Sequence, residues 1–416
     1  MEEKIYVYFD DDVNKRKLIG YLYFNFINGN QIYSFEFDKD FLKDGYNNIF
    51  LDNNLYPYTS RQYLPKNKRI FDFLSDLAPD RWGRTLIKRR EAINAKIENR
   101  DKRTLNEIDY LIQVEDVSRM GAIRLSLDGM NYLSNEENRK VPPFEFIRKL
   151  EAASLEYEKD EDLLNDKWLK QLIGPGSSLG GARPKATVID TNGELWIAKF
   201  PSKHDEFDQG AWEKTAHDLA KLCGLKTCET KLVKYSSLGS TFLMKRFDRK
   251  EKKRIHFISA MTALSANDGD GSQSNMGYLD ILSFIKTRCK NANENVLELF
   301  KRVVFNMCIS NIDDHFRNHG FILNNNSLEL SPIYDINPNA ESKYLSLNIT
   351  ENSSYISLDN ILEASIYYDL TKDEALNIIN SIKKIVRENY KTCAINNGLS
   401  DSSIRYMEDA FAFSKE

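Results

Sequence analysis

The sequence predicts an α+β protein in which a mixed α/β part precedes a mainly helical part. Two observations support this prediction. Apolar and polar residues alternate near the N-terminus, as in Ile5, Val7 and Phe9, and this period of two is typical of half-buried strands. Beyond about residue 256, apolar residues recur every three or four positions, which is typical of amphipathic helices.

Residues 1–50 predict a small antiparallel meander, because three alternating segments are separated by the turn-forming residues 10–12 and 28–30. Helical periodicity begins at Phe71. Thr104 and Glu107 then have the spacing of a helix capping box. A strand is expected at 121–127 and a helix at about 144–158.

The middle of the chain predicts a hairpin with a glycine-rich approach. Residues 174–185 hold four of the nineteen glycines. They precede two expected strands, 186–190 and 194–200, which Asn192-Gly193 joins. A helix at 208–222 and strands at 229–235 and 240–247 follow. Thr371 and Glu374 form a capping box that opens the last strong helix.

Composition narrows the function classes. A chain of 416 residues allows two or three domains. With 58 Lys and Arg against 62 Asp and Glu, the net charge of −4 excludes a broad cationic surface for nucleic acid. No run of about 18 apolar residues predicts a membrane helix, and residues 1–4 do not open a secretory signal. The five cysteines are widely spaced, so we expect no disulfide framework, no four-ligand zinc site, and a reduced cytoplasmic protein.

Two features of the middle region are typical of phosphate binding. Successive glycines allow backbone N–H groups to form an anion-binding nest, although an ordinary flexible loop would have the same composition. Lys199 ends an expected strand, and Glu213 follows fourteen residues later in an expected helix. Protein kinases pair a strand lysine with a helix glutamate in this way to hold the α- and β-phosphates.

The segment 311–321 is the richest in reactive side chains. Asp313 and Asn318 are five residues apart, the spacing of the kinase catalytic loop, in which the acid is the base and the asparagine binds magnesium. Asp335 follows an expected strand–turn–strand and would supply a second magnesium carboxylate. His315 and His319 are four residues apart and offer the alternative of a zinc site with Asp314.

Taken in order, these motifs resemble the HipA-like serine/threonine kinases, the toxins of bacterial type II toxin–antitoxin pairs. The segments that carry the resemblance are 77–84, 178–185, 196–199, 244–249, 311–318 and 330–335. The resemblance implies a two-lobed protein-kinase-like fold, with an added N-terminal subdomain (1–140), a nucleotide-binding N-lobe (141–255) and an all-helical C-lobe (256–416).

The resemblance also implies roles for individual residues. Asp313, Asn318 and Asp335 would be catalytic, with Asn318 and Asp335 as the magnesium ligands. Asp314 is a second acid beside the base, and only the spacing to Asn318 favours Asp313. The residues expected at ATP are Gly180, Gly181, Ala182, Arg183, Pro184, Lys185, Lys199, Glu213, Lys245, Arg246, Phe247, His315 and Tyr334.

The implied activity is transfer of a phosphoryl group from ATP, with Mg²⁺, to a serine or threonine of a protein. An aminoacyl-tRNA synthetase, such as glutamyl-tRNA synthetase, is the expected target, and growth inhibition the expected result. Some relatives are silenced by autophosphorylation in the glycine-rich loop, which Ser178 or its neighbour Ser177 would accept here. The expected partner is a HipB-like helix-turn-helix antitoxin, through which any DNA contact would be made. The alternatives are a co-repressor and a small-molecule kinase.

Overall fold

The computed structural model describes residues 2–12, 16–27, 30–43, 49–133, 141–159, 172, 181, 183–251 and 253–416. The chain divides into two compact units. The first unit comprises Met1–Lys203, Arg246–Ile258 and Ile322–Asn326, and the second comprises His204–Lys245, Ser259–Phe321 and Ser327–Glu416. No helix in the described ranges is long and apolar enough to cross a membrane. The predicted boundaries at residues 140 and 255 stay predictions.

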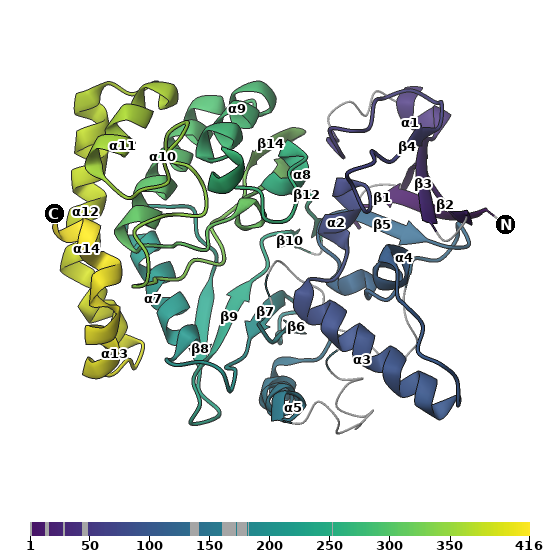
Figure 1. Ribbon diagram of the computed structural model, residues 1–416, viewed down its shortest axis with the longest axis horizontal. Helices are drawn as coiled ribbons and strands as arrows, with labels where there is room; N and C mark the ends of the chain where they lie inside the picture. The colour runs from purple at the N-terminus through teal and green to yellow at the C-terminus, as the bar shows by residue number, and fades with distance from the viewer. Residues whose placement is uncertain are drawn as a thin grey trace. The chain divides into compact units, whose positions relative to one another are not determined.

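The N-terminal part of the first unit is built on a five-stranded sheet in the order β4-β3-β2-β1-β5 (Figure 1). Its strands are β1 (Glu3–Phe9), β2 (Lys17–Ile27), β3 (Asn30–Phe37), β4 (Gln62–Tyr63) and β5 (Ile123–Ser126). Every neighbouring pair is antiparallel, and a bulge interrupts the β1–β2 register between Val7 and Tyr8. The meander predicted from the alternating pattern is therefore confirmed.

Four helices accompany this sheet: α1 (Lys39–Lys43), α2 (Asp72–Leu77), α3 (Arg81–Ile97) and α4 (Glu107–Leu111). Phe35 of the sheet packs edge to face against Phe71 and Phe73, within one continuous apolar core. The capping box predicted at Thr104 and Glu107 is wrong. Asn106 and Asp109 form the box instead, because asparagine is a better N-cap than threonine and has an acid three residues later.

The rest of the first unit holds α5 (Ile147–Lys159), the hairpin of β6 (Lys185–Ile189) and β7 (Leu195–Lys199), and the short pair β10 (Arg249–Lys250) and β11 (Lys253–Arg254). The hairpin turn is fixed by Asp190, whose Oδ1 accepts the N–H groups of Asn192 and Glu194, both at 2.9 Å. Gly193 has a φ of +81°, which glycine adopts without strain. The predicted hairpin is confirmed.

Helices dominate the second unit. They are α7 (Gln209–Leu222), α8 (Ala260–Leu264), α9 (Tyr278–Arg288), α10 (Ala292–Cys308), α11 (Leu358–Ala364), α12 (Lys372–Asn396), α13 (Asp401–Tyr406) and α14 (Ala412–Lys415). The long α12 packs against α7, α10 and α14 (Figure 1). It begins at the predicted capping box, in which Thr371 and Glu374 exchange hydrogen bonds.

The second unit also contains strands. The C-lobe expected at 256–416 is mainly rather than entirely helical, because β12 (Phe257–Ser259), β13 (Gly320–Asn324) and β14 (Ser327–Leu330) lie within those residues. Strands β8 (Thr230–Val233) and β9 (Thr241–Lys245) pair antiparallel. Strands β12 and β13 each have residues in both units, whereas β14 belongs to the second unit. The turn before β14 uses Asn325 and Asn326, both with positive φ, a conformation that asparagine tolerates. The predicted strand–turn–strand is confirmed.

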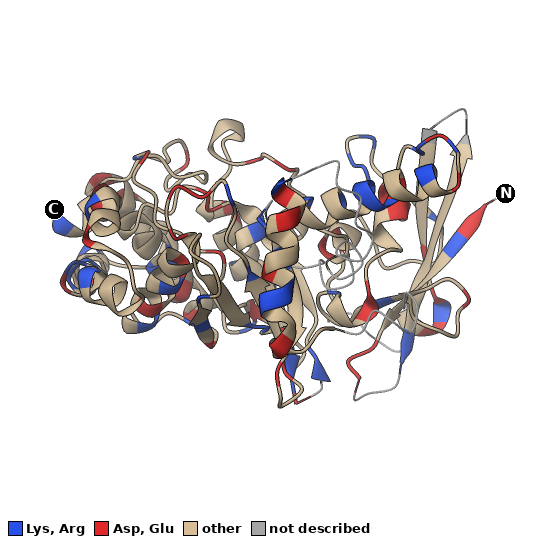
Figure 2. Ribbon diagram, turned by 90° about the horizontal axis from the view of Figure 1, so that it is seen from below, with Lys and Arg blue, Asp and Glu red and all other residues tan. Residues whose placement is uncertain are grey.

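Acidic and basic residues alternate along the ribbon of both units rather than occupying long segments of one sign (Figure 2). This distribution agrees with the near balance of 58 basic and 62 acidic residues. Electrostatic recognition by this chain must therefore come from local groups of side chains.

Candidate active site

The predicted base, Asp313, lies in the loop after α10 in the second unit. The last turns of α10 are buried, and the chain leaves the helix through Ser310, whose φ of +47° turns it sharply. Asp313 is exposed, and within the described residues its carboxylate accepts no hydrogen bond. Partial desolvation raises the pKa of Asp313; His315 opposes this effect, and Asp335 raises it further. A free carboxylate with a raised pKa is suited to accept a proton.

The neighbouring acid, Asp314, has a different environment. Its side chain is buried, and its Oδ2 accepts three hydrogen bonds: from the Tyr278 hydroxyl at 2.6 Å, Asn306 Nδ2 at 2.7 Å and His319 Nε2 at 2.8 Å. Burial, together with the Asp314 charge, raises the pKa of Tyr278 well above its ordinary value. The buried Asp314 carboxylate therefore stabilises the conformation of the loop. Asp313 is exposed, so it is the acid that a substrate hydroxyl can reach.

The side-chain amide of Asn318 is held in place by the backbone of the same loop. It ends the short 3-10 turn Phe316–Asn318, and its Nδ2 donates to the Asp313 carbonyl at 3.0 Å. That bond fixes the amide so that Oδ1 points away from the carbonyl. Oδ1 is buried and has no hydrogen-bond partner in the part of the chain that the structure describes. An unpartnered buried oxygen is costly, and a bound cation would relieve that cost.

Asp335 and Tyr334 follow β14. Asp335 has a φ of +55°, and strained backbone of this kind is concentrated at functional sites. Its charge acts on Asp313 and raises the pKa of that carboxyl. The buried Tyr334 donates its hydroxyl to the Arg317 carbonyl at 2.7 Å. This bond ties the segment carrying Asp335 to the loop carrying Asp313 and Asn318.

The residues of this loop fit a magnesium ion better than a zinc ion. Asn318 Oδ1 and the Asp335 carboxylate are hard oxygen ligands, and magnesium needs only one or two protein ligands because it keeps several waters. In the zinc alternative, Asp314 would have to ligate together with His315 and His319, yet Asp314 already binds His319. Throughout the described ranges, no group of three or more His, Cys, Asp and Glu side chains is arranged to hold a metal.

Only part of the predicted phosphate-binding loop lies within the described residues. Ser177, Ser178, Gly180 and Ala182 lie outside them. Gly181 has a φ of +93°, and a Cβ there would lie 3.3 Å from Lys185 Nζ. Arg183 and Pro184 lead from Gly181 into β6. Lys185 itself is buried and forms an ion pair with Asp80 at 2.8 Å. Asp80 also caps α3 through the N–H of Gly83.

The side chain of Arg246, a residue predicted at ATP, lies among residues of the first unit. Its guanidinium is buried and donates to Asp248 and to the carbonyls of Ser118 and Arg119, at 2.7 to 3.1 Å. Burial by itself would raise the pKa of Asp248, but Arg246 and Arg249 hold it well below the ordinary value. The Arg246 side chain is therefore part of the core of the first unit.

The remaining predicted nucleotide residues are placed separately in the two units. Phe247 packs against Phe257 with ring centroids 5.7 Å apart. Lys245 ends β9, where its N–H donates to the Glu229 carbonyl at 2.9 Å. Lys199 ends β7 in the first unit, and Glu213 lies in α7 of the second; both are buried. Their ion pair stays a prediction.

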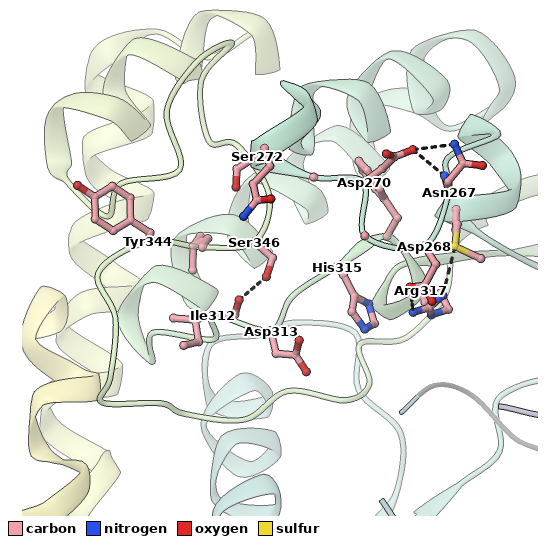
Figure 3. Close-up of a pocket in the computed structure, with 16 residues that line it drawn as sticks. Asn267, Asp268, Asp270, Ser272, Ile312, Asp313, His315, Arg317, Tyr344 and Ser346 are labelled. Atoms are coloured by element: carbon pink, nitrogen blue, oxygen red, sulfur yellow. Dashed lines mark hydrogen bonds and ion pairs between the residues drawn. The ribbon is translucent and has the colours of Figure 1, made fainter. Parts of the chain in front are cut away.

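Sequence reasoning missed several residues that shape these sites. Tyr278 and Asn306 hold Asp314 from helices 36 and 8 residues away along the chain, and no motif marks them. Asp80 was contained in the segment 77–84, but nothing in that segment connects it to Lys185. A glycine- and aspartate-rich turn at 267–273 lines the same hollow as Asp313 (Figure 3), and no motif marks that turn.

Comparisons with known proteins identify the family of this chain. Residues 177–390 match the model of the HipA-like C-terminal domain family. A Haemophilus influenzae protein that carries the name of a kinase is 24% identical over 230 residues, and the serine/threonine-protein kinase CtkA of Helicobacter pylori is 28% identical over 173 residues. These matches cover 50% and 39% of this chain, and 62% and 52% of the two relatives.

The fold has a counterpart over nearly its whole length. A chain in the Shewanella oneidensis complex of HipA, HipB and operator DNA has a TM-score of 0.70 and 16% sequence identity. The match covers 99% of this chain and 96% of that chain. At this identity the likeness shows the fold, and it includes the N-terminal part that the family model leaves out.

Proposed function

Because the chain belongs to the HipA-like C-terminal domain family, we propose that it is an ATP- and magnesium-dependent serine/threonine protein kinase. The observation that carries the proposal is the contrast between two adjacent acids. Asp314 is buried with three donors, whereas Asp313 is exposed and its carboxylate accepts no hydrogen bond from the described residues. A protein kinase needs one unoccupied carboxylate at this position to orient the acceptor hydroxyl.

Each residue has a role in this mechanism. Asp313 accepts a hydrogen bond from the acceptor hydroxyl and takes its proton as the new bond to phosphorus forms. Asn318 and Asp335 would hold magnesium, which offsets the charge of the phosphates when bound. Lys199, oriented by Glu213, would bind the α- and β-phosphates. The loop Gly180–Lys185 would cover them.

The proposal extends to regulation and partners. Phosphorylation of Ser178, or of Ser177, would add about two negative charges to a loop built to cover phosphates, and so disfavour its closed form. The Shewanella oneidensis chain of the same fold was solved with HipB and operator DNA. We expect a HipB-like antitoxin here as well, with DNA contacted through it, and a cytoplasmic aminoacyl-tRNA synthetase as the phosphorylated target.

The test is phosphate transfer by the purified protein. With labelled ATP and Mg²⁺, the wild type is expected to label itself or an added protein on serine or threonine. Asp313→Asn and Asp335→Asn are expected to lose that label, while Asp373→Asn, a change of an exposed acid at the start of α12, keeps it. Equal labelling by all four proteins, or none by the wild type, overturns the proposal.

A further inference from the structure

The chain crosses from the second unit into the first and back again around residues 246–258. Residues His204–Lys245 and Ser259–Phe321 belong to the second unit, whereas residues 246–258 belong to the first. The described residues 246–251 and 253–258 form the crossing segment. The segment begins with Arg246 and Phe247, which are expected at ATP. The contacts that hold the crossing segment therefore concern the expected nucleotide site.

The crossing segment is held by one loop of the N-terminal part, residues 116–121. Arg246 donates to two carbonyls of this loop, as described above. Arg249 also donates to two of its carbonyls, at 3.2 Å and 2.9 Å: those of Val117 and Arg119. Arg254 donates to both the carbonyl and the carboxylate of Asp116, at 3.0 Å and 2.9 Å. Hydrogen bonds from a charged guanidinium are stronger than neutral ones, so three arginines fasten the segment to the loop.

One bond runs in the opposite direction, from the loop to the crossing segment. The buried Asp248 accepts the N–H of Gly121 through Oδ2 at 2.8 Å. Gly121 has a φ of +71°, and a Cβ there would lie 3.0 Å from the backbone nitrogen of Phe257. The loop and the crossing segment thus approach each other more closely at this point than a side chain on residue 121 would allow.

The loop is itself fixed to the core of the N-terminal part. The buried guanidinium of Arg119 donates to three carbonyls, at 2.9 to 3.2 Å: those of Leu77, Leu111 and Val114. Two of these carbonyls belong to the last residues of α2 and α4, where the helix dipole favours a cation. At the start of the loop, Asp116 is also bound by Arg124 of β5. The position of the crossing segment therefore depends on the sheet and helices of the N-terminal part.

We infer that Arg249 and Arg254 are positioning residues for nucleotide binding, and that through them the N-terminal part sets the affinity of the kinase for ATP. The inference rests on the proposed kinase function. The two arginines act through the crossing segment, which they hold against the loop 116–121. A binding segment that is already ordered loses little conformational freedom when its ligand arrives. Loosening either arginine therefore weakens nucleotide binding.

The test measures nucleotide affinity and stability on the same full-length proteins. Titration calorimetry gives the Kd of a non-hydrolysable ATP analogue with Mg²⁺, and calorimetric unfolding gives the Tm. The variants are Arg249→Met, Arg254→Met and the milder Arg249→Lys. The matched control is Arg84→Met, which breaks the ion pair of Arg84 with Glu107 at 2.6 Å in the N-terminal part. Within the described residues, Arg84 makes no hydrogen bond to the crossing segment.

Arg249→Met and Arg254→Met are each expected to raise the Kd about tenfold, which is the effect of reducing the binding-competent population to about a tenth. In phosphate transfer, the KM for ATP should rise by a similar factor while kcat at saturating ATP stays near that of the wild type. Arg249→Lys should raise the Kd less, because lysine keeps the charge without the guanidinium geometry. This variant keeps the test decisive if a methionine variant does not fold.

The control Arg84→Met is expected to lower the Tm and to keep the Kd of the wild type. A wild-type Kd in the folded Arg249 and Arg254 variants, together with a lowered Tm, would show that these arginines serve stability alone and would overturn the inference. Failure of the proposed function is recognised separately, because the wild type then transfers no labelled phosphate and binds no ATP analogue.

Discussion

Substituting the two adjacent acids of the catalytic loop should separate catalysis from stability. Asp314→Ala removes the oxygen that accepts from Tyr278, Asn306 and His319, and it leaves three buried donors without their acceptor. At about 1.5 kcal/mol for each bond to a charged acceptor, the loss is about 4 to 5 kcal/mol. For a unit of this size, this corresponds to a fall in Tm of about 10 °C.

Asp313→Asn should behave in the opposite way. Its carboxylate accepts no hydrogen bond within the described residues, and its raised pKa means that the folded state disfavours its charge. Neutralising it should leave the Tm unchanged or slightly higher at pH 7. Phosphate transfer should fall by about 10² to 10⁴, the usual contribution of a general base.

Calorimetric unfolding and labelled-phosphate transfer, measured on the same preparations, check both variants. Asp314→Asn serves as an intermediate variant, because its amide oxygen can still accept some of the three bonds, and it should lose less stability than Asp314→Ala. The assignment is refuted if Asp313→Asn unfolds at a much lower temperature and still transfers phosphate at the wild-type rate.

Three further predictions concern buried polar groups. Burial lowers the pKa of His256 from 6.5 to about 4. Between these values the unfolded chain binds a proton that the folded chain does not. The free energy of unfolding should therefore fall by about 3 kcal/mol as the pH is lowered from 6.5 to 4. Urea unfolding across that range should show this slope in the wild type and lose it in His256→Gln. Asn318→Ala should weaken magnesium-dependent nucleotide binding by at least about tenfold, as measured by titration calorimetry, and should keep a Tm within a few degrees of that of the wild type. Unchanged binding would show that Asn318 is not part of the metal site. Asp248→Asn should cost about 3 to 5 kcal/mol in urea unfolding, because Arg246 and Arg249 would keep buried charges without their shared partner, and a loss below about 1 kcal/mol would contradict this account.

The elements that local patterns specify were predictable from sequence. The β1–β3 meander, the β6–β7 hairpin and the capping box of α12 depend on residues close together in the chain, so alternation and turn chemistry suffice to find them. The capping box before α4 was misplaced by two residues, because Thr104 and Asn106 each precede an acid by three. Asn106 is the observed N-cap, in agreement with the stronger N-cap preference of asparagine over threonine.

The candidate site could be predicted only as far as its own loop. The spacing of Asp313 and Asn318 and the position of Asp335 pointed to the chemistry, and the resemblance to a known family supplied the roles. The contrast in burial between Asp313 and Asp314 could not be obtained in this way. It depends on Tyr278 and Asn306, which reach Asp314 from separate helices. The turn 267–273 and Tyr344 likewise line the hollow beside Asp313 only after folding.

The ion pair between Asp80 and Lys185 has a consequence for dividing the protein into parts. The family model begins at residue 177, so a truncated protein starting there would seem a natural fragment to express. Such a fragment would lack the carboxylate that lies 2.8 Å from the buried Lys185 ammonium, and removing one member of a buried ion pair is destabilising. The N-terminal part therefore supplies the carboxylate that pairs with Lys185, the first residue of β6. Expression of the shorter fragment should yield a poorly folded protein, and Lys185→Met is the substitution that should partly restore it.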